Sequence, residues 1–362
     1  MELDAAAYVS GLLEEAVRMR ASDLHIEPRS DHLCIRQRVD GFLVQVDRLE
    51  KETMYPLISR LKVMGNLDIG EKRLPQDGAL TLTVDGERVD VRVSSMPTLH
   101  GEKVVLRLLR NRSELMSLQE LGMGEEERKR LTQLIKRTSG LLVVTGPTGA
   151  GKSTTLYAIL QELNREEVNL VTLEDPIEFQ LSGVNQIQIN PKAGLTFARG
   201  LRAVLRQDPN IIMVGEIRDQ ETADIAIRAA LTGHLVLSTL HTADASSTIT
   251  RFLDMGIEPY RIASSLIGVA AQRLVRLICR DCRGKGCHDC RQMGYRNRTG
   301  AFEVLSLKEE FQPMIVERAP LSRLRQSFQK AGMRSLSDVI LEKVMTGETT
   351  ISEYHRVVDS YE

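Results

Sequence analysis

The residues best suited to chemistry in this chain form a phosphate-binding loop. Residues 146–153 read Gly-Pro-Thr-Gly-Ala-Gly-Lys-Ser, directly after an apolar run and before a helical stretch. In this context the glycines let backbone N–H groups turn toward a β-phosphate, and the dipole of the following helix adds to the attraction. Lys152 would balance the charge of the β- and γ-phosphates, and the Ser153 hydroxyl would hold Mg²⁺. An ordinary glycine-rich turn is the alternative, but the strand and helix context argues against it.

We therefore expect ATP with Mg²⁺ as the ligand. The predicted nucleotide-binding residues are Gly146, Pro147, Thr148, Gly149, Ala150, Gly151, Lys152, Ser153 and Thr154. Phosphate binding is shared by many chemistries, so the residues around the loop must decide the reaction.

A carboxylate follows a second apolar run. Residues 211–214 read Ile-Ile-Met-Val and precede Gly215 and Glu216. A buried strand here would deliver Glu216 to the carboxyl edge of a parallel sheet. Gly215 stands where a metal-binding aspartate is usual, so Glu216 is the candidate to polarise the attacking water, and magnesium coordination stays open. The alternative is a surface glutamate that caps the next helix.

A second acidic cluster follows the apolar run at 170–173. Residues 172–178 read Thr-Leu-Glu-Asp-Pro-Ile-Glu, so Glu174 and Glu178 should also reach the phosphate edge of the sheet. Taken alone, the cluster is ordinary turn chemistry. We list both glutamates as candidate catalytic residues.

Two histidines flank the next apolar run. His234 and His241 stand at opposite ends of residues 235–239. With Thr239 they could sense a γ-phosphate, although a lone histidine is more often structural.

The elements that would position these residues fall into two groups. Apolar spacing predicts a helix at 5–20, and period-two alternation at 33–39 runs into the hairpin signal Asp40-Gly41. A second turn, Asp85-Gly86, joins two further strands. Residues 1–110 therefore predict a small α+β domain with an antiparallel sheet.

Residues 111–125 are polar and contain two glycines, which predicts a linker. From 126 to 362, short apolar runs alternate with helical stretches, as in a mostly parallel α/β sheet flanked by helices. We expect the last hundred residues to be largely helical. Thr350 and Glu353 have the spacing of a capping box at the final helix.

Composition restricts the function. The chain has 362 residues, enough for two domains, with 42% hydrophobic residues and a net charge of −1. No global positive field would attract nucleic acid or an anionic bilayer. The N-terminus has no signal-peptide pattern and no apolar run approaches 18 residues, which favours a cytosolic protein without direct nucleic-acid binding.

Four of the five cysteines form two Cys-x-x-Cys pairs: Cys279, Cys282, Cys287 and Cys290. Thiolates at this spacing favour tetrahedral Zn²⁺, with an iron–sulfur cluster or free thiols as alternatives. Cys34 lies in an alternating strand and is expected to be a buried small hydrophobe.

Together these motifs resemble the secretion-superfamily ATPases over nearly the whole chain. The matching segments of the second half are 146–153 (Walker A), 174–178 (Asp box), 214–219 (atypical Walker B) and 232–242 (His box). The matching segments of the first half are 21–28, 36–41, 73–78 and 92–94. Ser-Asp-Leu-His-Ile-Glu-Pro and Glu-Asp-Pro-Ile-Glu are similar to the assembly branch, namely type II secretion, type IV pilus-extension and competence-pseudopilus motors. Pilus-retraction motors look less similar.

The resemblance implies a PAS-like N-terminal domain and a RecA-like ATPase domain. It also implies a homohexamer, in which Arg92 and Arg107 match arginines that reach the phosphates from the N-terminal domain. Arg202, Arg206 and Arg218 match arginines near the ring interface. As bare residues, all five would be solvated or strand-face charges.

The implied function is an ATP-hydrolysing motor that acts through a polytopic platform protein and associates peripherally with the inner face of the cytoplasmic membrane. Two departures from the type II secretion pattern, a missing extra N-terminal domain and a compact cysteine module, favour a shorter motor of the competence type. A RecA-like nucleic-acid motor and a nucleotide-gated assembly factor with weak catalysis remain as alternatives.

Overall fold

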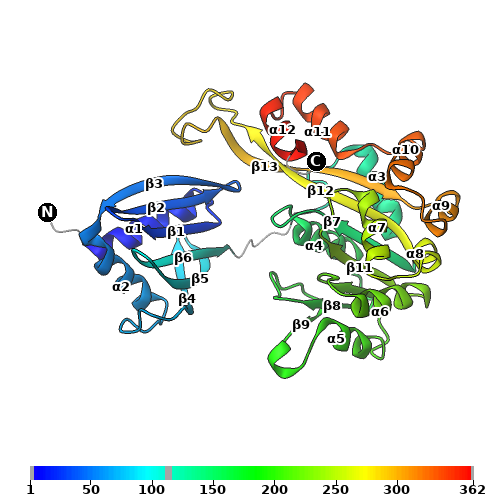
Figure 1. Ribbon diagram of the computed structural model, residues 1–362, viewed down its shortest axis with the longest axis horizontal. Coiled ribbons are helices and arrows are strands. Elements are labelled where there is room, and N and C mark those ends of the chain that lie inside the picture. Colours follow the sequence, from blue (N-terminus) through cyan, green and yellow to red (C-terminus); the bar gives the residue numbers. More distant parts are fainter. Residues whose placement is uncertain (1–3, 111–115, 360–362) are drawn as a thin grey trace. The chain divides into compact units, whose positions relative to one another are not determined.

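The computed structural model describes residues 4–110 and 116–359. The chain divides into two compact units, residues 1–113 and 114–362, and each has its own sheet (Figure 1). Residues 111–115 of the predicted linker lie outside the described residues.

The first unit is an antiparallel sheet of six strands, in the order β3-β2-β1-β6-β5-β4, with two helices that contact each other. Its elements are α1 (Ala5–Arg18), β1 (Asp23–Pro28), β2 (His32–Val39), β3 (Phe42–Glu50), the 3₁₀ turn Lys51–Thr53, α2 (Met54–Met64), β4 (Gln76–Val84), β5 (Glu87–Thr98) and β6 (Gly101–Arg110). The helix α1 buries Val9, Leu13 and Val17 because they recur on one face. The predicted α+β architecture is confirmed.

Both predicted hairpin turns are present. Asp40 and Gly41 connect β2 to β3 with φ values of 49° and 90°, and Asp85 and Gly86 connect β4 to β5 with φ values of 51° and 83°. Two successive positive φ values match the right-handed twist of the flanking strands, which is why Asp-Gly is favoured here.

The second unit is built on a sheet of seven strands, in the order β13-β12-β7-β11-β10-β8-β9. Neighbouring strands are parallel except for β12 and β13. Its elements are α3 (Glu125–Ile135), β7 (Gly140–Thr145), α4 (Lys152–Leu163), β8 (Leu170–Glu174), β9 (Asn185–Gln188), the 3₁₀ turn Pro191–Ala193, α5 (Phe197–Val204), β10 (Ile211–Val214), α6 (Gln220–Leu231), β11 (Leu235–Leu240), α7 (Ala245–Asp254), α8 (Pro259–Ser265), β12 (Leu266–Ile278), β13 (Tyr295–Ser306), the 3₁₀ turn Glu309–Phe311, α9 (Gln312–Val316), α10 (Leu321–Lys330), α11 (Leu336–Met345) and α12 (Ile351–Val358).

Helices cover both faces of this sheet. Because its central strands are buried on both sides, their residues are mostly apolar. Leu141 and Val143 of β7 enter the core that also contains residues of α5, α6 and α7, whereas Leu142 and Val144 enter the core with α3 and α4. A strand buried on both faces reads as an unbroken hydrophobic run, as expected for a parallel sheet.

The expectation that the last hundred residues are largely helical is wrong in one important part. Two long strands, β12 and β13, pair over most of their length, and β12 extends the sheet beside β7. The first eight residues of β12 are buried, so no period-two alternation marks them in the sequence.

The predicted capping box at the last helix is half correct. Thr350 Oγ1 accepts a hydrogen bond of 3.2 Å from the N–H of Glu353. The Glu353 carboxylate instead accepts from Arg276 and Arg356, because these guanidiniums tie α12 to β12. The reciprocal box occurs at α11, between Ser335 and Asp338.

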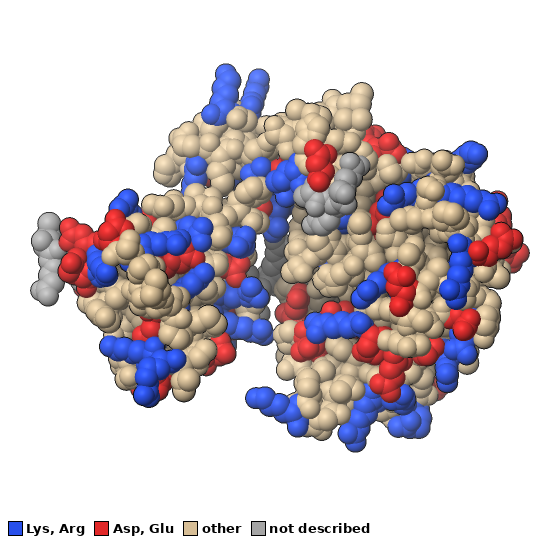
Figure 2. Space-filling view, in the orientation of Figure 1, with Lys and Arg blue, Asp and Glu red and all other residues tan. Residues whose placement is uncertain are grey.

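The surface carries mixed charge. On the face in Figure 2, Lys and Arg side chains are interspersed with Asp and Glu on each unit, in keeping with the net charge of −1. Among the described residues, no helix combines the length and apolar composition that a membrane span requires.

Candidate active site

The loop between β7 and α4 is shaped by its glycines. Gly146, Gly149 and Gly151 have φ values of 151°, 79° and 87°, which side-chain-bearing residues rarely adopt. A Cβ on Gly146 would also lie 2.5 Å from the carbonyl oxygen of Gln272 in β12. The loop therefore packs closely on the sheet and leads directly into α4, whose first N–H groups have no intrahelical partner.

A cavity of about 430 Å³ opens beside this loop, within the size range of small-molecule sites. Its lining comes from the loop, from the ends of several strands and from the β12–β13 hairpin. The lining residues are Thr148, Gly149, Gly151, Lys152, Ser153, Thr154, Leu156, Tyr157, Glu174, Asp175, Pro176, Glu178, Phe197, Met213, Gly215, Glu216, Thr239, His241, Leu274 and Arg298. Six of the nine predicted loop residues are among them, and Gly146, Pro147 and Ala150 are not.

Lys152 lies within this cavity. Its Nζ donates hydrogen bonds of 2.8 Å and 3.0 Å to the carbonyl oxygens of Gly146 and Pro147. Burial lowers the pKa of Lys152 to about 8, with a smaller contribution from Arg273, while Glu216 opposes the shift. The ammonium remains mostly charged at neutral pH and is suited to an anionic ligand.

Glu216 follows β10 at the same edge of the sheet and is mostly buried. It forms an ion pair with Arg218, and His241 Nε2 lies 3.9 Å from its Oε2. Burial and Lys152 lower the pKa of His241 below its usual 6.5, so His241 is mainly neutral at pH 7. Glu216 thus lies near Arg218, His241 and Lys152.

Glu174 is 4% exposed, and several donors hold its carboxylate. Tyr157 donates its hydroxyl proton to Oε2, while Thr172 Oγ1 and Gln186 Nε2 donate to Oε1 over 2.5 Å and 3.0 Å. Burial, followed by Glu174, raises the pKa of Tyr157. Glu174 therefore belongs to a buried network at the cavity wall.

Tyr157 is a site residue that sequence reasoning missed. Its hydroxyl oxygen also accepts from the N–H groups of Glu178 and Phe179, both at 3.3 Å. Tyr157 thereby joins α4 to the segment that carries Glu178. The available signal was weak: a tyrosine among the apolar residues of a helix needs a partner for its hydroxyl when buried.

The structure does not bring the two histidines together. His241 lines the cavity, whereas His234 precedes β11 at the opposite edge and its Nδ1 lies 3.0 Å from the carbonyl oxygen of Ala229. Six strand residues separate the two edges by roughly 20 Å. Joint sensing of one γ-phosphate by both histidines of a chain is therefore wrong.

Arg92 and Arg107 lie in the first unit, outside the unit that contains the cavity. They face each other on β5 and β6, and Arg107 Nε donates to Asp23 over 2.9 Å. Arg92 is exposed.

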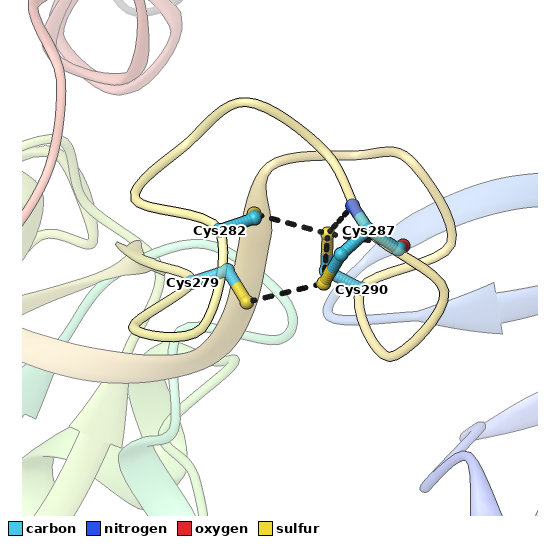
Figure 3. A group of neighbouring side chains, drawn as sticks. All are labelled: Cys279, Cys282, Cys287 and Cys290. Atoms are coloured by element: carbon cyan, nitrogen blue, oxygen red, sulfur yellow. Dashed lines mark hydrogen bonds between the residues drawn. The ribbon is translucent and has the colours of Figure 1, made fainter.

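The four clustered cysteines converge on one point between β12 and β13 (Figure 3). Their sulfurs are 3.9 Å apart for Cys279 and Cys287, 3.7 Å for Cys282 and Cys290, and 3.6 Å for Cys287 and Cys290. Four sulfurs around a tetrahedral Zn²⁺ would be about 3.8 Å apart. The cluster fits zinc, and Cys34 is a separate buried thiol as predicted.

Comparison with known proteins decides the family. A family model described as Type II/IV secretion system protein matches residues 5–356. The chain belongs to this family. The resemblance seen in its motifs is thereby confirmed.

Individual relatives of this Type II/IV secretion family member agree with the family assignment. The chain is 48% identical to the Type II secretion system ATPase E of Vibrio cholerae serotype O1, covering 96% of this chain and 74% of that protein. It is 28% identical to the pilus retraction motor PilT with bound ADP, with a TM-score of 0.66 and coverage of 96% and 95%. The Legionella pneumophila ATPase DotB shares the fold, with a TM-score of 0.77 at 24% identity and coverage of 98% and 96%. The expected competence-type motor gains no support from these relatives.

Proposed function

We propose that this chain is an ATPase that powers a type II secretion or type IV pilus-like machine. One observation carries the proposal: a glycine-rich loop places Lys152 in a cavity with Glu216 at the carboxyl edge of a parallel sheet. The chain covers most of a relative named as a type II secretion ATPase.

Each residue has a defined part in hydrolysis. The N–H groups of the loop and Lys152 bind the phosphates, so Lys152 exchanges its carbonyl partners for phosphate oxygens. Glu216 accepts a proton from the attacking water, and neutral His241 offers a hydrogen bond beside it. The Ser153 hydroxyl would hold Mg²⁺, which when bound would supply charge neutralisation at the phosphates.

The assembled form belongs to the same proposal. We infer a homohexamer in which Arg92 and Arg107 act on a nucleotide bound elsewhere in the ring, as the family resemblance implies. An arginine acting on a γ-phosphate is worth on the order of 10³-fold or more in other NTPases. Contact with a polytopic platform protein would hold this cytoplasmic motor at the inner face of the membrane.

Replacement of Lys152 tests the proposal. We expect purified chain to release phosphate from ATP with Mg²⁺, and Lys152→Ala to reduce that rate on the order of 10²-fold because the loop loses its only side-chain cation. Exposed Lys192, replaced by Ala, is the matched control. Phosphate release by Lys152→Ala at the wild-type rate would contradict the proposal, and stimulation of the wild type by DNA at physiological salt would favour the nucleic-acid motor.

A further inference from the structure

A carboxylate outside the nucleotide cavity joins the segment that carries His241 to the C-terminal helices. Glu303 of β13 accepts hydrogen bonds of 3.2 Å at Oε1 from the N–H of Ala245 and at Oε2 from the N–H of Leu336. These N–H groups begin α7 and α11 (Figure 1). One side chain thus holds the starts of two ten-residue helices, where an anion is favoured.

The segment from His241 to Ala245 is held at both ends. On the nucleotide side, the N–H of Thr242 donates to Thr145 Oγ1 over 3.0 Å, and Thr145 directly precedes the phosphate-binding loop. In the middle, Arg273 of β12 donates to the carbonyl oxygen of Ala243. On the far side, Glu303 holds Ala245. Only three residues lie between His241 and Ala245, so a displacement of α7 would reach His241 through a short segment.

Charged groups surround Glu303. Asp244 precedes α7 and accepts from Arg325 Nε of α10 over 2.9 Å, and Arg334 precedes α11. Glu127 of α3 lies 3.9 Å from Arg334. Asp244, Glu303, Arg325 and Arg334 border a cavity of about 80 Å³, which leaves part of the Glu303 side chain accessible.

We propose that Glu303 is a positioning residue for ATP hydrolysis, which fixes the His241 segment against the phosphate-binding loop and couples it to α10 and α11. The inference rests on the proposed ATPase function. The ionised carboxylate suits this role best, because each of its oxygens accepts with full charge, whereas protonation turns one of them into a weaker-accepting hydroxyl.

Burial, followed by Asp244, raises the pKa of Glu303 to about 7, while the two N–H groups and Arg325 oppose the shift. Because the folded-state pKa lies above the usual value, ionising Glu303 costs folding free energy, so this contribution to stability is present at acid pH and lost as pH rises through about 7. The ionised Glu303 carboxylate, which positions His241, is therefore also the protonation state in which the folded protein is less stable.

Glu303→Gln in the full chain separates a positioning role from a structural one. At pH 8 we expect kcat for ATP to fall about fivefold, the equivalent of one ordinary hydrogen bond, with KM unchanged. The melting temperature should stay equal or rise, because the amide removes a buried charge. Wild-type kcat should also fall as pH drops through about 7, and Glu303→Gln should lack that step.

Controls make the outcomes distinct. Exposed Glu317→Gln should match the wild type in rate and in pH profile. Lys152 and His241 titrate in both wild type and variant, so the difference between the two profiles belongs to Glu303. Two results would overturn this inference and leave the proposed function standing. One is a kcat of Glu303→Gln at pH 8 equal to that of the wild type, and the other is a reduced kcat accompanied by a lower melting temperature. No hydrolysis by the wild-type chain would instead overturn the proposed function.

Discussion

Tyr157 shows how one side chain organises the wall of the active site. Its hydroxyl donates to Glu174 and accepts from two backbone N–H groups of the segment that contains Glu178. A buried hydroxyl that both donates and accepts hydrogen bonds stabilises the groups around it. Its removal leaves those donors and acceptors without partners. Glu174 and Glu178 are thus fixed by the same helix that begins at Lys152.

Tyr157→Phe tests this arrangement. Removal of the hydroxyl leaves the two N–H groups without their acceptor, so we expect the free energy of unfolding to fall by about 1–3 kcal/mol. The rate of ATP hydrolysis should fall as well, since Glu174 becomes less constrained. Denaturant unfolding and phosphate release measure the two effects. Tyr55, which is 59% exposed, gives the control Tyr55→Phe, and equal behaviour of the two variants would contradict the role of Tyr157.

At the residue scale, the sequence predicted what is local and missed what is distant. The loop at 146–153 and Glu216 were found because their spacing and the preceding apolar runs lie within a few positions. Tyr157 and Glu303 were missed because their partners lie 17 and 58 positions away. No spacing rule connects such pairs before the strands are ordered.

The β12–β13 hairpin is the element that the sequence pattern did not predict. A strand that is buried along eight residues gives the same apolar run in the sequence as a buried helix. Only the length of the run and its content of β-branched side chains distinguish the two. Its placement beside β7 brings Gln272, Arg273 and Leu274 to the phosphate-binding loop. Gln272 Oε1 accepts from Thr155 Oγ1 of α4 over 2.7 Å, so the hairpin supports the helix that binds phosphate.

Measurement of bound zinc tests the cysteine module at the end of this hairpin. We expect about one zinc per chain in protein purified without chelator, since four thiolates meet at tetrahedral spacing. Cys282→Ser should lower the zinc content and the melting temperature, because the loop between the strands loses its cross-link. Cys34→Ser is the control and should retain zinc. Wild-type protein with far less than one zinc per chain would favour iron–sulfur or free thiols instead.

For the whole molecule, the sequence predicted an antiparallel α+β unit followed by a parallel α/β unit, and both are present. Their sheets follow from period-two alternation in the first half and from unbroken apolar runs in the second. On the face drawn in Figure 2, basic and acidic side chains are mixed on each unit. The rate of ATP hydrolysis is therefore the property that tests the proposed function.

Glu216→Gln tests the central claim most directly. The amide keeps the shape of the side chain but cannot accept a proton from water, so we predict ATP binding within a few-fold of the wild type and phosphate release reduced at least ~100-fold. The two quantities are measured together, by nucleotide binding and by single-turnover phosphate release from the same preparation. Unchanged phosphate release with intact ATP binding would contradict Glu216 as the base and favour a nucleotide-gated assembly factor.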